Sequence, residues 1–172
     1  MIYIEKNNPK LHKDKWGLGE WANEPDKVQF LDEDTSYPCL IVRNNRGSLC
    51  GYVGIDKNHP SYEKEYDDVD VYIHGGLTFS SKCQEKNKEF GVCHIEDDGE
   101  DDNIWWLGFD CGHYYDMAPW EYGTNNDEVI KYIDEAMPSF NKPFFGSEYR
   151  NIDYVKKEIK LLAAQLKSIE LK

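Results

Sequence analysis

One stretch of the chain, residues 105–119 (WWLGFDCGHYYDMAP), constrains the fold more than any other. The apolar run at residues 104–109 is the most apolar of the chain, and it predicts a buried, central β-strand. Reactive or charged side chains follow it within seven positions, at Asp110, Cys111, His113 and Asp116. Because sheets usually present sites on the loops that follow their strands, we expect a site here.

A second stretch, residues 69–81 (VDVYIHGGLTFSS), has the same form. Apolar and polar residues alternate over residues 69–74, which is typical of a strand with one buried face. The pair Gly75–Gly76 ends this predicted strand, and Thr78 follows it. We therefore expect His74 to face Asp110, His113 and Asp116 from a neighbouring strand end. The predicted supporting residues of the site loops are Gly75, Gly76, Thr78 and Cys111.

Several shorter apolar runs predict further strands, and two of these form a hairpin around the turn at residues 44–47. The runs are Lys27–Leu31, Pro38–Arg43, Leu49–Ile55 and residues 90–95. A capping-box pattern at residues 124–127 predicts a helix that Pro138 stops. Asn151 is a good N-cap for a last helix, whose apolar residues recur at helical spacing.

The order of these elements predicts the fold class. Strands come first, helices come last, and short turns rather than crossover helices link the strands. We expect residues 1–172 to form a single α+β domain, in which a mainly antiparallel, twisted sheet is covered by two C-terminal helices. A chain of 172 residues is long enough to bury a core of this kind.

The charge balance excludes some partners. A formal net charge of -13 argues against direct nucleic-acid binding through phosphates and against anionic membranes. No apolar run is long enough to span a membrane. The acidity leaves three interpretations open: solubility, a metal site, and a surface that mimics nucleic acid and occupies a basic groove on a partner.

The cysteines indicate a compartment. The chain has five of them, an odd number, without a CxxC pair and without a secretory signal. We therefore expect free thiols and a location in a reducing cytoplasm.

Residues 96–102 place six carboxylates within seven positions. Mutual repulsion predicts a solvated hairpin tip, and the ligand spacing of a calcium loop is missing. The alternative is an acidic loop that binds a partner through Glu96, Asp97, Asp98, Glu100, Asp101 and Asp102.

The His/Asp residues allow four interpretations. As ligands, His74, Asp110, His113 and Asp116 suit a divalent transition metal such as Zn, Mn or Fe, which could activate water. As a nucleophile, Cys111 would need exposure and a histidine base, although strand alternation groups it with the core. The same residues could brace the two loops by hydrogen bonds to backbone. A ligand pocket is the fourth interpretation, lined by His74, Thr78, Trp106, Asp110 and Tyr114.

Several segments resemble a group of small phage and prophage proteins. They are His59–Pro60, Tyr66-Asp67-Asp68, the HGGLT of residues 74–78, the GFDC-x-H-x-x-D of residues 108–116, and residues 149–155. The resemblance spans residues 49–166. Asn58 stands where glycine is usual, and Gly112 where alanine is common. The resemblance implies an origin in a phage or a prophage and no particular reaction.

These observations favour a non-enzymatic accessory protein that binds and inhibits a host factor. An anti-CRISPR or other anti-defence inhibitor is the concrete form, with a basic-grooved host protein such as a defence nuclease as partner. An acidic face would compete there with nucleic acid. The alternatives are a metal-dependent hydrolase with a His/Asp site and a protein that sequesters a small ligand.

Overall fold

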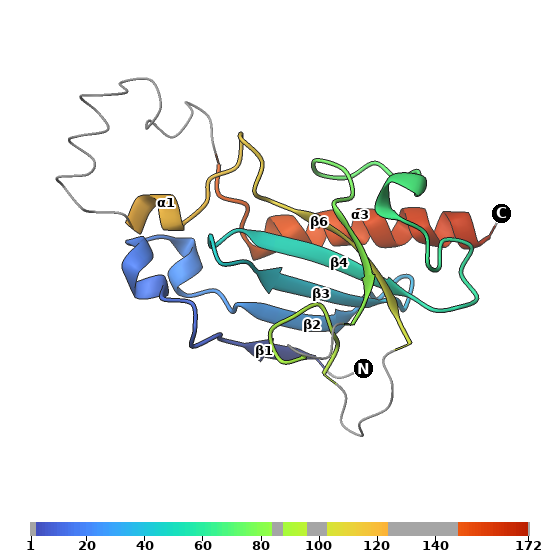
Figure 1. Ribbon diagram of the computed structural model, residues 1–172, viewed down its shortest axis with the longest axis horizontal. Coiled ribbons are helices and arrows are strands. Elements are labelled where there is room, and N and C mark those ends of the chain that lie inside the picture. Colours follow the sequence, from blue (N-terminus) through green and yellow to red (C-terminus); the bar gives the residue numbers. More distant parts are fainter. Residues whose placement is uncertain (1–2, 84–87, 96–102, 124–147, 172) are drawn as a thin grey trace.

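The apolar runs of the sequence form an antiparallel sheet in the computed structural model of the protein (Figure 1). The structure describes residues 3–83, 88–95, 103–123 and 148–171. The strands are β1 (Ile4–Lys6), β2 (Lys27–Leu31), β3 (Pro38–Arg43), β4 (Leu49–Ile55), β5 (Phe79–Lys82) and β6 (Trp105–Asp110). The helices are α1 (Trp120–Gly123), α3 (Ile152–Glu170) and the 3-10 helices η1 (Lys13–Trp16), η2 (Glu20–Ala22) and η3 (Tyr66–Asp68).

The sheet has six strands in the order β1-β2-β3-β4-β6-β5, and every neighbouring pair is antiparallel. The predicted hairpin of β3 and β4 is confirmed with its bounds. Strand β6 lies between β4 and β5, as its continuous apolar run requires. Gly51 of β4 is needed there, because a Cβ atom would lie 2.5 Å from the Phe109 ring.

One face of the sheet is covered by helix α3 (Figure 1). The side chain of Asn151 caps this helix by accepting a hydrogen bond from the Tyr154 amide at 3.0 Å. The helix buries a stripe at i, i+4, i+7, i+8 and i+11 spacing, made of Val155, Ile159, Leu162, Ala163 and Leu166. These residues share one core with Ile41, Leu49, Val53, Leu107 and Phe109 of the sheet.

The expectation of two covering helices is corrected to one, since the described sheet packs against α3 alone. The first of the two predicted helices falls within residues 124–147, outside the described residues.

The opposite face of the sheet is covered by residues 88–95, a segment that includes the strand predicted at residues 90–95. That prediction is wrong: the segment consists of turns and bends. The backbone of residues 88–95 is bound by two buried side chains of β2 rather than by the backbone of a neighbouring strand. The Lys27 ammonium donates to the carbonyls of Lys88, Gly91 and Cys93 at 3.0, 2.8 and 2.6 Å, and Gln29 bonds both backbone groups of Ile95.

The prediction of five free thiols is also corrected. Cys83 and Cys93 form a disulfide that joins the end of β5 to the covering segment. Cys39, Cys50 and Cys111 are free and buried. The cysteine count alone could not show that the chain brings Cys83 and Cys93 together, with their Cα atoms 4.7 Å apart.

Residues 69–74 are not the predicted strand either. They run beside α3 and bond its side chains: Gln165 bonds both backbone groups of Tyr72, and Glu158 accepts from the His74 amide at 2.8 Å. The alternation still identified the buried side, since Val69 and Ile73 are buried while Tyr72 is exposed. Periodicity indicates burial but not which groups satisfy the backbone.

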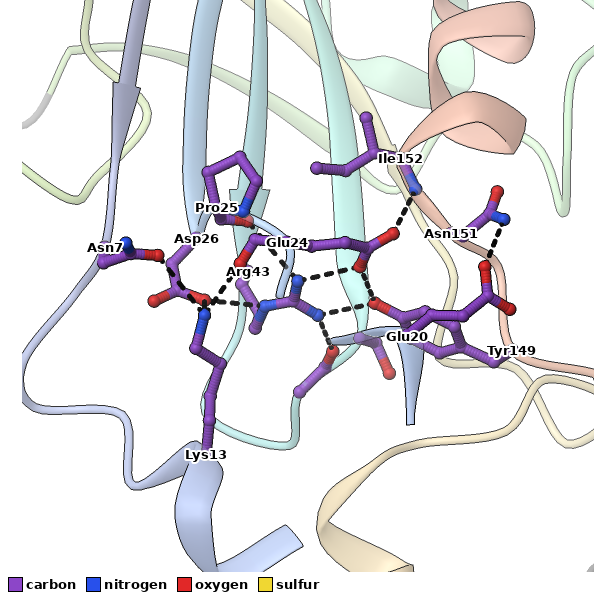
Figure 2. Close-up of polar contacts among 12 residues, drawn as sticks. Asn7, Lys13, Glu20, Glu24, Pro25, Asp26, Arg43, Tyr149, Asn151 and Ile152 are labelled. Carbon is purple, nitrogen blue, oxygen red and sulfur yellow. Dashed lines mark hydrogen bonds and ion pairs between the residues drawn. The ribbon is translucent and has the colours of Figure 1, made fainter. Parts of the chain in front are cut away.

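A buried guanidinium fastens one end of the sheet (Figure 2). Arg43, the last residue of β3, has a fully buried side chain, which donates to Asp26 at 2.8 Å and to Glu24 at 3.0 Å. It also donates to the Gly47 carbonyl and to the Tyr149 hydroxyl. Glu24 in turn accepts from the Ile152 amide at the start of α3. The network therefore ties the N-terminal segment and the helix to the sheet.

We predict that Arg43→Met lowers the free energy of unfolding by about 3–5 kcal/mol, because it removes the buried charge that pairs with Asp26 and Glu24. Urea unfolding at neutral pH measures the loss. Arg46→Met is the matched control: its ion pair with Glu121 is exposed on both sides, so its removal should cost less than about 1 kcal/mol. Equal losses in the two variants would contradict the assigned role of Arg43.

Candidate functional site

The chain after β6 makes a tight turn that brings His113 and Asp116 together. The Asp116 amide donates to the His113 carbonyl at 2.9 Å, and a carboxylate oxygen of Asp116 accepts from the His113 amide at 3.1 Å. A backbone bridge to Glu148 fixes Asp116 from the other side. Because the chain turns here, two side chains three positions apart in the sequence lie close together in space.

His74 meets this turn from residues 69–76. Its Nε2 lies 2.9 Å from Oδ2 of Asp116, and Nδ1 of His113 lies 3.3 Å from the same oxygen. The two imidazole rings are 5.3 Å apart at their centroids. The side chains of His74 and Asp116 are 4% and 0% exposed, whereas that of His113 is 24% exposed, so solvent reaches the cluster at His113.

Two residues of the cluster were not singled out from the sequence: Arg150 and Tyr154. Arg150 donates through Nε to Oδ1 of Asp116 at 3.0 Å. The Tyr154 hydroxyl lies 2.8 Å from Nδ1 of His74. The guanidinium also lies over the Tyr154 ring, 4.7 Å from its centroid. The available signal was the Tyr-Arg-x-x-x-Tyr segment of residues 149–154, but Arg150 precedes the N-cap Asn151, and the segment alone does not show which turn the two side chains reach.

The negative charge of Asp116 is offset within the cluster by the positive charge of Arg150. Burial raises the pKa of Asp116. The hydrogen bonds from His74 and Arg150 and the other interactions of the carboxylate together lower it by more, so the net pKa is below the ordinary value of 3.8. Burial lowers the pKa of Arg150, but the hydrogen bond to Asp116 and the charges of Asp116, Glu148 and Tyr154 together raise it by more, so the net pKa is above its ordinary value. Asp116 is therefore ionised and Arg150 charged at neutral pH.

Two of the predicted site residues lie elsewhere. Asp110 accepts from the Thr78 hydroxyl at 2.9 Å and from the Gly112 amide at 3.0 Å, so it braces the start of β5 against the turn after β6. Cys111 is buried in the core with Phe109. Burial, with the charge of Asp116, raises the pKa of its thiol, which disfavours the nucleophile interpretation.

The two glycines shape the contact between the loops. Gly75 and Gly76 have φ values of +64° and +83°, which side chains rarely adopt. A Cβ atom on Gly75 would lie 2.1 Å from the His113 ring. Gly75 is therefore needed both for the turn and for the close approach of His113. The stacking of His113 on Tyr115 holds the ring from its own turn.

An open groove of about 520 Å³ lies beside this cluster. Residues 71–76 form one wall, and Tyr154, Glu158 and Leu161 of α3 form the other. Of the residues predicted to line a ligand pocket, only His74 borders this groove. The groove is wide enough for a side chain or a small molecule.

The cluster offers two kinds of chemistry. His74, His113 and Asp116 each present one ligand atom, all within 4.8 Å of one another, which is a donor set for a transition metal. Without an ion, the same atoms form hydrogen bonds centred on the Asp116 carboxylate. The predicted acidic loop at residues 96–102 lies outside the described residues.

Comparisons of the chain with protein-family models, curated proteins and solved structures found no match. The phage and prophage resemblance therefore stays a prediction that depends on the quoted segments. Within the described residues, no helix has the length and apolar character needed to span a membrane.

We predict that Asp116→Asn lowers the free energy of unfolding by about 3 kcal/mol at neutral pH, since it breaks a buried ion pair. Because the folded-state pKa of Asp116 is lowered, this contribution is present above the ordinary pKa of 3.8 and is lost as the pH falls through the folded-state value. The difference between wild type and variant should therefore shrink below about pH 4. Urea unfolding between neutral pH and pH 3 measures it.

The control for this prediction is Asp110→Asn, which removes a nearby carboxylate that has no part in the cluster. We expect the free energy of unfolding to fall by about 1 kcal/mol, because a neutral Asn side chain makes weaker hydrogen bonds than the carboxylate does. A larger loss for Asp110→Asn than for Asp116→Asn would contradict the described network.

Proposed function

We propose that the protein is a non-catalytic binding protein whose partner is a basic protein surface. The observation that carries the proposal is an acidic, tyrosine-bearing surface at residues 63–72, directly beside the groove. Asp67, Asp68 and Asp70 are exposed there, and none of these carboxylates pairs with a cation among the described residues. Tyr66 and Tyr72 are 42% and 92% exposed.

Exposed tyrosines beside unpaired acids are typical of a partner-binding surface. Tyrosine supplies large contact area and often carries much of the binding energy at interfaces. Carboxylates speed the approach of a basic partner and select against acidic ones. Tyr72, at the end of the acidic segment, also borders the groove.

The acidic surface is held in place before any partner binds. His59 lies with Nε2 2.9 Å from the Leu166 carbonyl of α3, and its Nδ1 accepts from the Ser61 amide at 2.9 Å. The Trp105 indole donates to the Lys64 carbonyl at 3.1 Å. A surface that is already ordered loses less conformational entropy on binding, which favours affinity.

The partner we propose is a host defence nuclease whose nucleic-acid groove is basic. The net charge of -13 supports this form, because an acidic face can occupy a groove built for phosphates. Inhibition would follow from competition with nucleic acid, as in an anti-CRISPR or other anti-defence inhibitor. Residues 96–102 would add a second acidic contact, and the resemblance to phage and prophage proteins would make the setting a bacterial host.

The first test reverses the acidic surface. Binding to a panel of purified RNA-guided and restriction nucleases, free of nucleic acid, is measured by interferometry between about 50 and 500 mM salt. We expect Asp67→Lys/Asp68→Lys to weaken binding at least about tenfold and to flatten the salt dependence, because two charge pairs are lost. The control is Glu5→Lys/Asp14→Lys, which makes the same charge change at exposed positions on β1 and η1. Equal weakening by both variants would contradict the proposed surface, because binding would then depend on the net charge of the protein and not on the position of the acids.

The second test removes the most exposed aromatic anchor. We expect Tyr72→Ala to weaken the same binding by about tenfold while leaving the salt dependence unchanged, since it removes contact area and no charge. Stability should be unaffected, because the Tyr72 side chain is 92% exposed. Binding that is unchanged in both Tyr72→Ala and the charge-reversed variant would reject this face as the binding surface.

A further inference from the structure

We propose that His74, His113 and Asp116 bind one divalent transition-metal ion, with Zn²⁺ as the preferred ion. The inference goes beyond the binding function above and is independent of any partner. Two imidazole nitrogens and one carboxylate oxygen are a donor set that favours Zn²⁺, Co²⁺ or Fe²⁺ over Mg²⁺ and Ca²⁺, which prefer oxygen alone.

Two of the three donor-atom distances are close to those around a bound ion. Bonds of about 2.1 Å in a tetrahedral site place neighbouring ligand atoms about 3.4 Å apart. The Asp116 carboxylate oxygen lies 2.9 Å from Nε2 of His74 and 3.3 Å from Nδ1 of His113. All three donor atoms lie within 4.8 Å of one another. Two atoms bound to one ion at about 2.1 Å can be at most about 4.2 Å apart, so binding would hold the two imidazole nitrogens within that distance.

The surroundings orient each donor as the outer shell of a metal site does. The Tyr154 hydroxyl meets Nδ1 of His74, which leaves Nε2 directed at the cluster. Arg150 bonds Oδ1 of Asp116 and the His113 amide donates to Oδ2, so the carboxylate is held with Oδ2 facing the two imidazoles. Such partners fix ring and carboxylate orientation and raise the affinity of the ligands they hold.

Packing holds the His113 ring in addition to its hydrogen bond with Asp116. Its ring lies against the bare backbone of Gly75 on one side and stacks on Tyr115 at 5.4 Å. Its side chain is 24% exposed, whereas the other two donors are buried. A bound ion would therefore keep its remaining coordination position on the solvent side, next to His113.

Arg150 sets the expected strength of binding. It neutralises the charge of Asp116, so the two imidazoles supply most of the attraction for the ion. We therefore expect an affinity well below that of a structural zinc site with thiolate ligands.

The test uses the full chain, treated with chelator and then freed of it. Calorimetric titration with Zn²⁺ should give one site per chain, and Co²⁺ should give the visible absorption of a site with nitrogen ligands and low coordination number. His113→Ala should weaken Zn²⁺ binding at least about tenfold, and His12→Ala, which removes an exposed histidine outside the cluster, should leave it unchanged. A thermal melt of each variant without metal confirms that it is folded.

Three results would overturn the proposal. They are the absence of Zn²⁺ binding tighter than about 100 μM by the wild-type chain, equal affinity in His113→Ala, and displacement of Co²⁺ by excess Ca²⁺. The last would place the ion on carboxylates alone. None of these measurements involves a partner protein, so failure of the metal site and failure of the proposed binding function are distinguishable.

Discussion

The buried guanidinium of Arg43 is the constraint on which the rest of the structure depends. A charge with no exposure to water is stable only if all its donors are satisfied, and Arg43 has five. Its acceptors come from the segment before β2, from the turn after β3 and from Tyr149 before α3 (Figure 2). Three distant parts of the chain must therefore meet at one end of the sheet.

The candidate site depends on the same meeting point. Tyr149 bonds Arg43, and the next residue, Arg150, bonds Asp116. Asn151 then caps α3, whose Tyr154 meets His74. One short segment thus connects the ionic network of the N-terminal half to the His/Asp cluster. The position of the cluster is determined by the fold as a whole rather than by its own loop.

Sequence reasoning succeeded where an apolar run pairs with neighbouring strands, as in β3, β4 and β6. It failed at residues 69–74 and 90–95, because their backbone partners are side chains far away in sequence, Gln165, Glu158, Lys27 and Gln29. It placed His74, His113 and Asp116 near one another by the positions of predicted loops. It missed Arg150 and Tyr154, because nothing local shows that a helix start reaches a turn 34 residues earlier.

The attachment of residues 72–74 to α3 has a mechanical consequence for the groove. This wall is held to the helix by the long side chains of Gln165 and Glu158 rather than by a strand ladder. Buried Ile73 and the His74 ring, which bonds Tyr154 and Asp116, anchor the same wall from its inner side. One wall of the groove is thus built from residues that also form the His/Asp cluster, so a change in the cluster would be felt in the groove.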